Sequence, residues 1–464
     1  IFALDVTDPD PPNSAAGASD VVLWEFTDAS GNDDGRDGRD MGYSFGKPAI
    51  VRIDDAGGGG DEPAWVVLVG NGYENRSTQG ENAAACGDAQ AGSPTNCTVS
   101  QTGNAVLYVL NLAGEDAQRI RGHMDTLEGS EDAPDTAAAG DNAAPCSGES
   151  NNDDPADSRS NGLGEVSTLD EDGDLVADRA YAGDLFGNLW RFDLTDLDAT
   201  PVKIFTAEDA DGNRQPITTR IAFVRHPNGG HMLLFGTGRF LNTADKHDDS
   251  VQTFYGIWDT DRYWSGESFD IPERGDLLQH AFTADDIAVN GDGGIVSLGR
   301  ISTATPTNTV TEPRGWMIDL VPVGDNDASA ECSGAERIAS APQVRQGRVV
   351  FVSVIPGGAC VAGGVSWINA LDAIDGSRLA VTPFDFNLDG YFDEADLLAA
   401  QAGERTVGSS IRVTAESEAG IYSAPAMLGL GGGELMSILS DSAGNLLQLE
   451  ESNAYGWRTW LQLE

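Results

Sequence analysis

Short apolar runs, each ending at Asp, Asn or Glu, recur along the whole chain. Almost no long stretch has the 3.6-residue apolar period of an amphipathic helix, so these runs predict β-strands. Seven of them share one signature, and they are IFALD ending at Asp5, LYVLN at Asn111, LWRFD at Asp193, FYGIWD at Asp259, GWMID at Asp319, INALD at Asp372 and LLQLE at Glu450.

A second apolar run precedes several of the signature runs. These companions are WVVLVGN from Trp65, AYAGD from Ala180, HMLLFGTG from His231, RVVFVSV from Arg348 and ELMSILSD from Glu434. Paired strands repeated without intervening helices predict the blades of a β-propeller, in which radial stacking buries both faces of each sheet. We therefore predict an all-β chain that forms one irregular seven-bladed β-propeller over residues 1–464. TWLQL, from Thr459, could pair with the N-terminal IFALDV and close the ring.

Polar insertions interrupt the repeat at residues 83–104 and 125–162, and we expect both to be long loops. The cysteines lack zinc-site spacing, and disulfides in an exported protein suit them better, although five inert thiols are the alternative. We would pair Cys332 with Cys360 and Cys86 with either Cys97 or Cys146, which leaves one over.

The chain contains no apolar run long enough to span a membrane. It begins at Ile1 inside an expected strand, without methionine or a signal peptide, so we expect a mature or cut fragment of a larger protein.

Acidic residues dominate the charge, since 27 Lys and Arg against 75 Asp and Glu give a formal net charge of −48. The negative charge is spread along the chain and argues against nucleic acid or an anionic membrane as a partner. Divalent cations are the natural counter-ions. The alternative for most of these carboxylates is a solvated surface suited to a salty medium.

Residues 170–178 have the spacing of a calcium-binding loop, and an all-oxygen ligand set suits a hard cation. Compared with the EF-hand template, Gly173 stands at position 4 instead of 6, and Tyr181 replaces the twelfth ligand. The expected ligands at positions 1, 3, 5, 7 and 9 are Asp170, Asp172, Asp174, the carbonyl of Val176, and Asp178.

A second acidic loop, at residues 385–398, matches the EF-hand or dockerin-like template better, with Gly390 at position 6 and Asp in place of the final Glu. The segment ADLLAAQ can form the exiting helical turn, and an ordinary acidic turn is the alternative. The expected ligands at positions 1, 3, 5, 7, 9 and 12 are Asp385, Asn387, Asp389, the carbonyl of Tyr391, Asp393 and Asp396.

The first acidic loop leads directly into a predicted β-hairpin. AYAGDL and NLWRFDL are joined by Phe186-Gly187-Asn188, where glycine and asparagine tolerate positive φ.

Several segments together resemble the C-terminal β-propeller domain of the PilY family, whose members are adhesin and biogenesis proteins associated with the tip of type IV pili. The resemblance covers nearly the full chain, and its most specific part is residues 170–194. The other segments are ALDVTDP from Ala3, MGYSFGKPAI from Met41, WVVLVGNGY from Trp65, QPIT from Gln215, LLFGTGRFL from Leu233, FYGIWD, GWMIDL, the ERIASAPQV to SWINALDAIDG region, and SAPAM from Ser423.

The resemblance implies a calcium-dependent role in pilus extension and retraction, twitching motility and surface attachment, with calcium held by residues 170–178. It also implies an extracellular location at the cell surface or pilus tip, or association with the outer membrane. Minor pilins at the tip and a host or abiotic surface are the implied partners. The amino-terminal region of these proteins, often with a von Willebrand A-like module, is absent from this sequence.

Two other functions are alternatives to the pilus role. The AYAGDLFGNLWRFDL hairpin also resembles the repeats of PQQ-type quinoprotein dehydrogenases, which use calcium as well. The chain lacks the vicinal Cys-Cys pair of those enzymes and any GxSxG, HExxH or P-loop motif, so we expect no catalysis. A purely structural, calcium-stiffened extracellular scaffold is separated from the pilus role only by the resemblance.

One short motif, Arg274-Gly275-Asp276, is the tripeptide that integrins recognise. Leu277, Leu278 and Phe282 follow it, and they indicate an ordinary structured segment instead.

Overall fold

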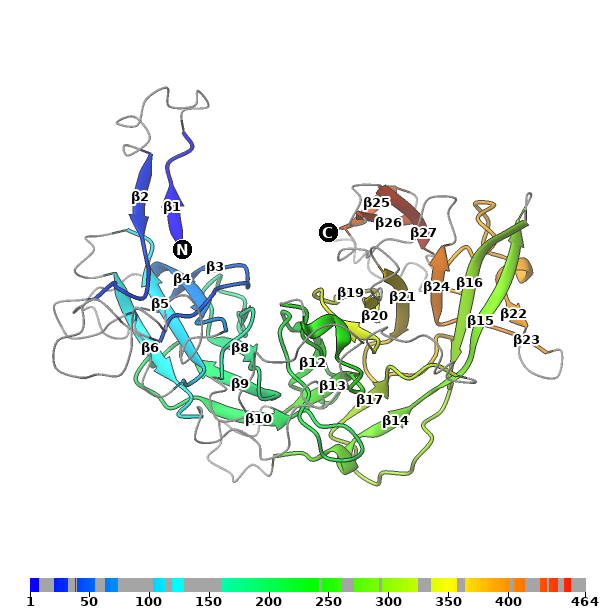
Figure 1. Cartoon of the computed structure of the whole chain (residues 1–464), viewed down its shortest axis with the longest axis horizontal. Coiled ribbons are helices and arrows are strands. Elements are labelled where there is room, and N and C mark those ends of the chain that lie inside the picture. The colour runs from blue at the N-terminus through cyan, green and yellow to red at the C-terminus, as the bar shows by residue number, and fades with distance from the viewer. Residues whose placement is uncertain are drawn as a thin grey trace, which may run out of the picture. The chain divides into compact units, whose positions relative to one another are not determined.

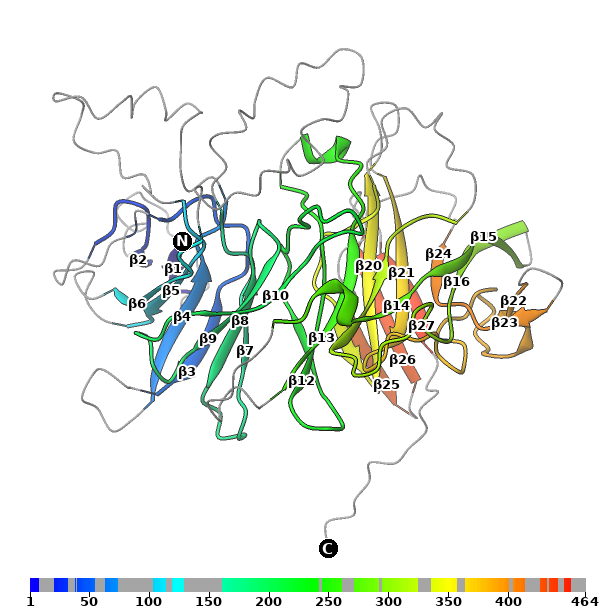
Figure 2. The same cartoon turned by 90° about the horizontal axis from the view of Figure 1, so that it is seen from below.

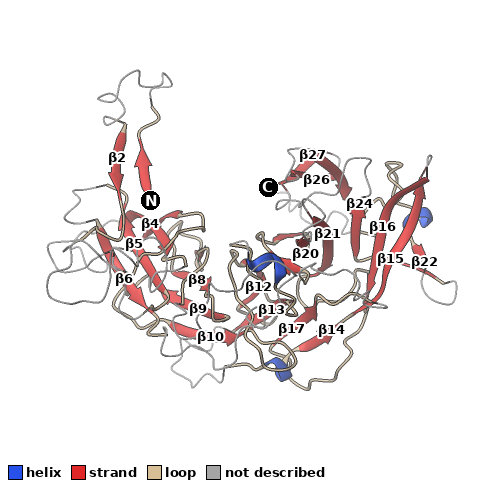
Figure 3. Cartoon of the chain, viewed as in Figure 1, coloured by secondary structure: helices blue, strands red, loops and turns tan. Residues whose placement is uncertain are grey.

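The all-β prediction is confirmed by a computed structural model of the chain, in which strands form nearly all the regular structure (Figure 3). The only helices in the part that it describes are 3-10 turns at Ala244–His247, Arg274–Asp276 and Glu394–Asp396. No helix there is long and apolar enough to cross a membrane. The structure describes residues 1–7, 21–31, 38, 40–54, 63–73, 103–113, 119–128, 161–241, 244–260, 271–291, 294–323, 335–356, 364–399, 404–413, 426–431, 434–440 and 446–451.

The chain divides into two compact units. The first comprises Ile1–Asp135 and Asn151–Lys203, and the second comprises Thr136–Ser150 and Ile204–Glu464. In the first unit, the described strands form a ribbon of β1 (Phe2–Leu4) and β2 (Val22–Glu25), a sheet in the order β3 (Ala49–Ile53), β4 (Ala64–Gly70), β5 (Val106–Asn111) and β6 (Ile120–Asp125), and a sheet in the order β10 (Val202–Thr206), β9 (Asn188–Asp193), β8 (Arg179–Gly183) and β7 (Ser167–Leu169) (Figure 1). The boundary between the units falls within β10.

The second unit contains two larger sheets. The first has the order β11 (Ala222–Arg225), β12 (His231–Gly236), β13 (Thr253–Asp259), β17 (Gly315–Asp319) and β14 (Leu278–His280), with β14 parallel to β17. The second has the order β15 (Phe282–Gly291), β16 (Gly294–Ser302), β24 (Ser410–Val413), β21 (Gly364–Asp372), β20 (Arg348–Pro356) and β18 (Arg337–Ile338), and β19 (Gln343–Arg345) also pairs with β20. The smaller sheets are β22 (Leu398–Ala399) with β23 (Arg405–Thr406), and β25 (Ala426–Gly431), β26 (Glu434–Ser440) and β27 (Leu446–Glu451).

All seven signature runs lie in strands, namely β1, β5, β9, β13, β17, β21 and β27. The companion runs are β4, β8, β12, β20 and β26, and each pairs antiparallel with the signature strand that follows it, as β20 and β21 show in Figure 2. β13 and β17 belong to one sheet, so the number of signature runs does not equal the number of sheets that contain them. The number of blades, the single domain and the closure of the ring stay predictions, and TWLQL lies outside the described residues.

Strand β4 of sheet β3–β6 is buried on both faces from Val66 to Val69, as expected for a strand inside a propeller. Along β4, Val66 and Leu68 join one hydrophobic cluster with residues of β8 and β9, whereas Val67 and Val69 join a second cluster with Trp24 and residues of β5. A strand covered on both faces reads as a continuous apolar run, which explains the sequence VVLV that follows the exposed Trp65. β20 has the same arrangement in the second unit.

The hairpin between β8 and β9 differs from its prediction in one respect. The connection runs from Asp184 to Gly187, and Gly187 has the predicted positive φ of 82°. Asn188 is instead the first residue of β9 and is fully buried. Its amide donates to Asp184, which also accepts hydrogen bonds from Asn161 and Trp190, so a buried polar network fixes this turn.

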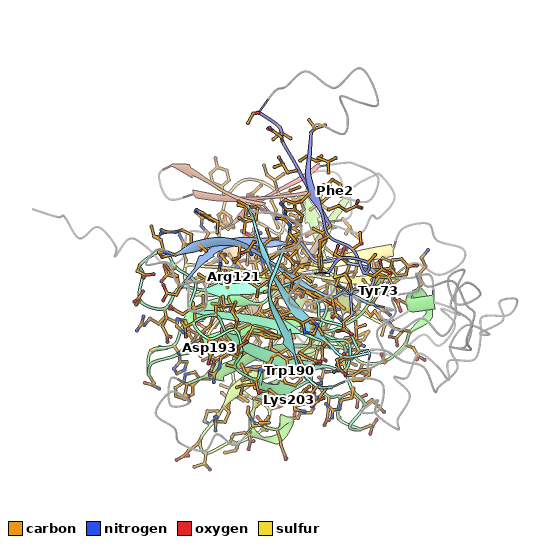
Figure 4. The ribbon with its side chains drawn as sticks, turned by 90° about the vertical axis from the view of Figure 1, so that its left-hand side faces the viewer. Phe2, Tyr73, Arg121, Trp190, Asp193 and Lys203 are labelled. Atoms are coloured by element: carbon orange, nitrogen blue, oxygen red, sulfur yellow. The ribbon has the colours of Figure 1, made fainter. Side chains whose placement is uncertain are left out.

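The β1–β2 ribbon is anchored at its base and projects from sheet β3–β6 (Figures 1 and 4). Phe26 is fully buried and Trp24 nearly so, and the indole of Trp24 donates to the carbonyl of Leu112. Phe2, by contrast, is 64% exposed (Figure 4).

Residues 303–312 have no regular structure. Nearly all of the insertions at 83–104 and 125–162 lies outside the described residues, as do all five cysteines, so the disulfide hypotheses stay predictions.

Candidate metal centre

The first acidic loop connects β7 to β8, and the strands on either side hold its last residue in place. The amide of Asp178 donates to the carbonyl of Leu169 at 3.0 Å, and the carbonyl of Asp178 accepts from the amide of Leu194 at 2.9 Å. Residues 170–178 therefore form a short excursion between two strands whose separation is set by the sheet.

Three of the expected ligands come together in this loop. Asp170, Asp172 and Asp174 each offer a carboxylate oxygen, and these atoms lie within 4.8 Å of one another. The loop is shaped by its own carboxylates, because Asp170 accepts hydrogen bonds from the amides of Gly173 at 2.7 Å and Leu175 at 2.9 Å. The amide of Asp174 likewise donates to Asp172.

The remaining two expected ligands are Asp178 and the carbonyl of Val176. Asp178 is not part of this group of three, and its Oδ2 accepts the amide of Glu171 at 2.7 Å. Burial raises the pKa of Asp178, the Glu171 hydrogen bond opposes that rise, and the charges of the other three aspartates add to it. The side chain of Val176 is buried and its amide donates to Asp174.

The second acidic loop begins at Asp385, next to Phe386, which is buried in a hydrophobic cluster, and it ends where β22 begins. Asp385 accepts from the amides of Asp389 at 3.3 Å and Gly390 at 2.7 Å. The amide of Asp389 also donates to Asn387, and the amide of Tyr391 donates to Asp389.

The two loops share one hydrogen-bonding pattern when they are numbered from their first aspartate. In both, the amide at position 6 donates to the carboxylate at position 1, the amide at position 5 to the side chain at position 3, and the amide at position 7 to the side chain at position 5. The loops lie in different units, so the same local conformation occurs twice in the chain.

The backbone conformation explains why glycine stands at position 4 in the first loop and at position 6 in the second. Both loops have positive φ at positions 4 and 6: Gly173 (84°) and Leu175 (71°) in the first, and Leu388 (57°) and Gly390 (82°) in the second. Each loop therefore supplies glycine at one of these positions and leucine at the other. The misplaced glycine of the first loop does not indicate a different fold.

Asp396, at position 12, is fully buried and closes the second loop. It accepts the amides of Phe386 at 2.8 Å and Asp393 at 3.0 Å, and Asp393 in turn accepts the amide of Ala395. Burial raises the pKa of Asp396, these hydrogen bonds oppose the rise, and Asp385 adds to it. The exiting helical turn expected over ADLLAAQ is wrong. A 3-10 turn covers only Glu394–Asp396, and Leu398–Ala399 is extended because it pairs with β23.

The donor set of both loops fits calcium. Every candidate side-chain donor is an oxygen, and a carboxylate has about four lone-pair sites. Asp170 uses two of these for backbone amides. About two therefore remain for a cation, so shaping the loop and binding a metal do not compete.

Two features of the first loop escaped the sequence analysis. Glu171, at the unassigned position 2, forms a 2.6 Å ion pair with the buried Arg179, the first residue of β8. Ala177 donates its amide to the carbonyl of Arg52 in β3 at 2.8 Å. Glu171 and Arg179 are eight residues apart in a chain with many acidic residues, so the sequence does not indicate that they pair. The backbone bond from Ala177 to Arg52 depends on no side chain, so the sequence does not indicate it either.

The tripeptide at residues 274–276 is tied into the fold. The guanidinium of Arg274 forms a 2.6 Å ion pair with Asp319 and donates to the carbonyl of Glu208, and Asp276 accepts the amide of Glu273. This engagement favours the structural interpretation over recognition by integrins.

Comparison with known proteins bears on the whole chain and on the first loop in particular. Residues 155–289 match the family described as the PilY1 beta-propeller domain. The chain contains a PilY1 β-propeller domain. The matched residues include the first acidic loop and the β8–β9 hairpin, whereas the second acidic loop lies beyond them.

Relatives of the PilY1 domain match over most of the chain. A type IV pilus biogenesis factor PilY1 homolog of Xylella fastidiosa is 32% identical over 81% of this chain and 21% of its own length. The type IV pilus biogenesis factor PilY1 of Pseudomonas aeruginosa strain PAO1 is 28% identical over 85% of this chain and 29% of its own length. The chain thus spans less than a third of either relative.

The fold agrees with that of a solved PilY1 domain. The crystal structure of the Pseudomonas aeruginosa PilY1 C-terminal domain matches with a TM-score of 0.66 and 23% identity, and it covers 97% of this chain and 77% of that one. The prediction of a β-propeller domain of the PilY family is therefore confirmed.

Proposed function

We propose that this chain serves in type IV pilus biogenesis as a calcium-binding, tip-associated adhesin domain. Calcium occupancy regulates pilus extension and retraction, twitching motility and surface attachment. The domain acts outside the cell, at the surface or pilus tip, with minor pilins and a host or abiotic surface as partners.

The observation that carries this proposal is the first acidic loop within the family-matched segment. Three carboxylate oxygens converge there within 4.8 Å, in residues that match the PilY1 beta-propeller domain. Relatives that cover most of the chain are named as pilus biogenesis factors. Those names also support a non-enzymatic role over a quinoprotein dehydrogenase.

Electrostatics gives calcium a physical effect on the loop. Two unit charges about 4 Å apart repel by roughly 4 kcal/mol at an effective dielectric constant near 20. A divalent cation replaces this repulsion with attraction and favours the closed loop. The second loop, with the same hydrogen-bonding pattern, binds a second calcium ion through Asp385, Asn387, Asp389, the carbonyl of Tyr391, Asp393 and Asp396.

Titration calorimetry on single-loop variants tests calcium binding. With the second loop disabled by Asp385→Ala and Asp389→Ala, we expect one site, which Asp178→Ala weakens and Asp170→Ala with Asp178→Ala abolishes. Unchanged calcium heat after that double substitution would show that residues 170–178 are not the site.

Twitching and piliation of bacteria that carry the same substitutions test the biological role. We expect loss of calcium binding at residues 170–178 to alter both. Loss of binding with normal twitching and piliation would leave a structural, calcium-stiffened scaffold as the function.

A further inference from the structure

The first acidic loop contacts more than the hairpin that it precedes. Its residue Ala177 donates a backbone hydrogen bond of 2.8 Å to the carbonyl of Arg52 in β3, which belongs to the other sheet of the first unit. Val176 and Ala177 are only 5% and 6% exposed. Ala177 packs in the cluster that contains Ile53 of β3 and Ala180 of β8. The loop therefore ends inside the junction between sheet β3–β6 and sheet β7–β10.

The position of Ala177 between two expected ligands links this junction to the metal centre. The carbonyl of Val176 precedes it and Asp178 follows it. Fixing both neighbours on one cation also fixes the amide of Ala177, since one residue between two held points has little remaining freedom.

Asp178 is itself held by the surrounding structure. Its backbone bonds Leu169 and Leu194, and its carboxylate accepts the amide of Glu171. The ion pair between Glu171 and the buried Arg179 then fixes that end of the loop to the start of β8. Glu171 and Arg179 are positioning residues, because they orient Asp178 without being expected ligands.

We propose that residues 170–178 form a calcium-controlled clasp that joins sheet β3–β6 to sheet β7–β10. The inference rests on the proposed calcium site and adds the structural change that occupancy controls. Without the cation, repulsion among Asp170, Asp172, Asp174 and Asp178 favours local opening of the loop, and the bond from Ala177 to Arg52 breaks with it. With the cation, opening requires release of the ion.

Hydrogen exchange of the Ala177 amide measures the clasp directly. The experiment uses the whole chain with Asp385→Ala and Asp389→Ala, in calcium and in EGTA at matched ionic strength. An opening that releases the ion is suppressed about a hundredfold when free calcium is 100 times the dissociation constant. We therefore expect exchange at Ala177 to slow by about that factor.

A ligand variant supplies the matched control. Asp174→Ala removes a carboxylate and the hydrogen bond that it accepts from the amide of Val176, but it leaves the partners of the bond from Ala177 to Arg52 in place. Calcium should therefore no longer slow exchange at Ala177. A circular dichroism spectrum matching that of the parent chain establishes that the variant is folded. The comparison of calcium with EGTA in the chain whose first loop is intact does not depend on the Asp174→Ala variant.

The outcomes separate the clasp from the site. Slower exchange of the Ala177 amide in calcium than in EGTA supports the clasp. Calcium heat with protection at Gly173 and Leu175 but none at Ala177 overturns the clasp and leaves the calcium site intact. Absence of calcium heat overturns both.

Discussion

Leu175 and Leu388 are the residues that sequence templates would least expect in a metal loop. Both adopt the left-handed conformation, which costs a residue with a Cβ about 1–2 kcal/mol relative to the right-handed one. Neither side chain is buried, at 77% and 43% exposure, so packing does not compensate. The hydrogen bonds from the position-6 amides to Asp170 and Asp385 offset this cost in each loop.

Replacing Leu175 with glycine should therefore stabilise the chain. Glycine removes the left-handed cost but loses roughly 0.5–1 kcal/mol in backbone entropy, so we expect a net gain of about 0.5–1 kcal/mol. The free energy of unfolding in urea, measured in EGTA, reports this gain.

The reciprocal substitution is Gly173→Ala. A Cβ at Gly173 meets no atom within 4 Å, so the cost of about 1–2 kcal/mol comes from the positive φ alone. Loss of the glycine returns roughly 0.5–1 kcal/mol of backbone entropy, so we expect a net loss of about 0.5–1 kcal/mol. Equal stability of both variants and the parent chain would mean that the loop does not hold these backbone angles in solution.

At the scale of elements, strands with strong apolar runs were predictable and short ones were not. WVVLVGN and RVVFVSV are buried on both faces, so their residue types alone indicate a strand. β14, of sequence LQH, becomes a strand because it lies parallel to β17, and nothing in three residues signals such pairing. β2 has the sequence VLWE, and it is a strand because it pairs with β1 and because its Trp24 contacts Leu112.

The convergence of three expected ligands was predictable from the sequence, and the contacts around them were not. The spacing of Asp170, Asp172 and Asp174 anticipates their convergence, because alternate residues of a tight loop point toward one centre. The bond from Ala177 to Arg52 depends on how two sheets stack, which no local pattern encodes.

The β1–β2 ribbon should depend on its buried base and not on its exposed end. Phe26 is fully buried against Tyr108 and neighbouring residues of sheet β3–β6, and Phe26→Ala should cost about 3–5 kcal/mol through lost burial and a cavity. Phe2, on the same ribbon, is 64% exposed. Phe2→Ala should change the free energy of unfolding by no more than about 0.5 kcal/mol.

Urea denaturation of the two variants provides the comparison. Near-equal losses would show that the exposed end of the ribbon is covered in solution. Protection of the β1 amides in hydrogen exchange would then locate the covering contact.

For the whole molecule, the dominant feature is a net charge of −48. Repulsion among so many carboxylates destabilises the compact state. Salt weakens this repulsion, because the Debye length falls from about 10 Å at 0.1 M to about 3 Å at 1 M. General screening and the proposed calcium binding would therefore both stabilise the chain, and their concentration dependence distinguishes them.

We expect sodium chloride to raise the midpoint of thermal unfolding gradually up to 1 M. Calcium should raise it further along a saturating curve. Part of that rise should persist in 1 M sodium chloride, since several carboxylate ligands attract a divalent ion more strongly than a monovalent one. A variant with Asp170→Ala, Asp174→Ala, Asp385→Ala and Asp389→Ala should keep the sodium response and lose the saturating calcium response. If calcium and sodium at equal ionic strength shift the midpoint equally in the parent chain, the acidic loops are part of a diffuse negative surface and bind no specific ion.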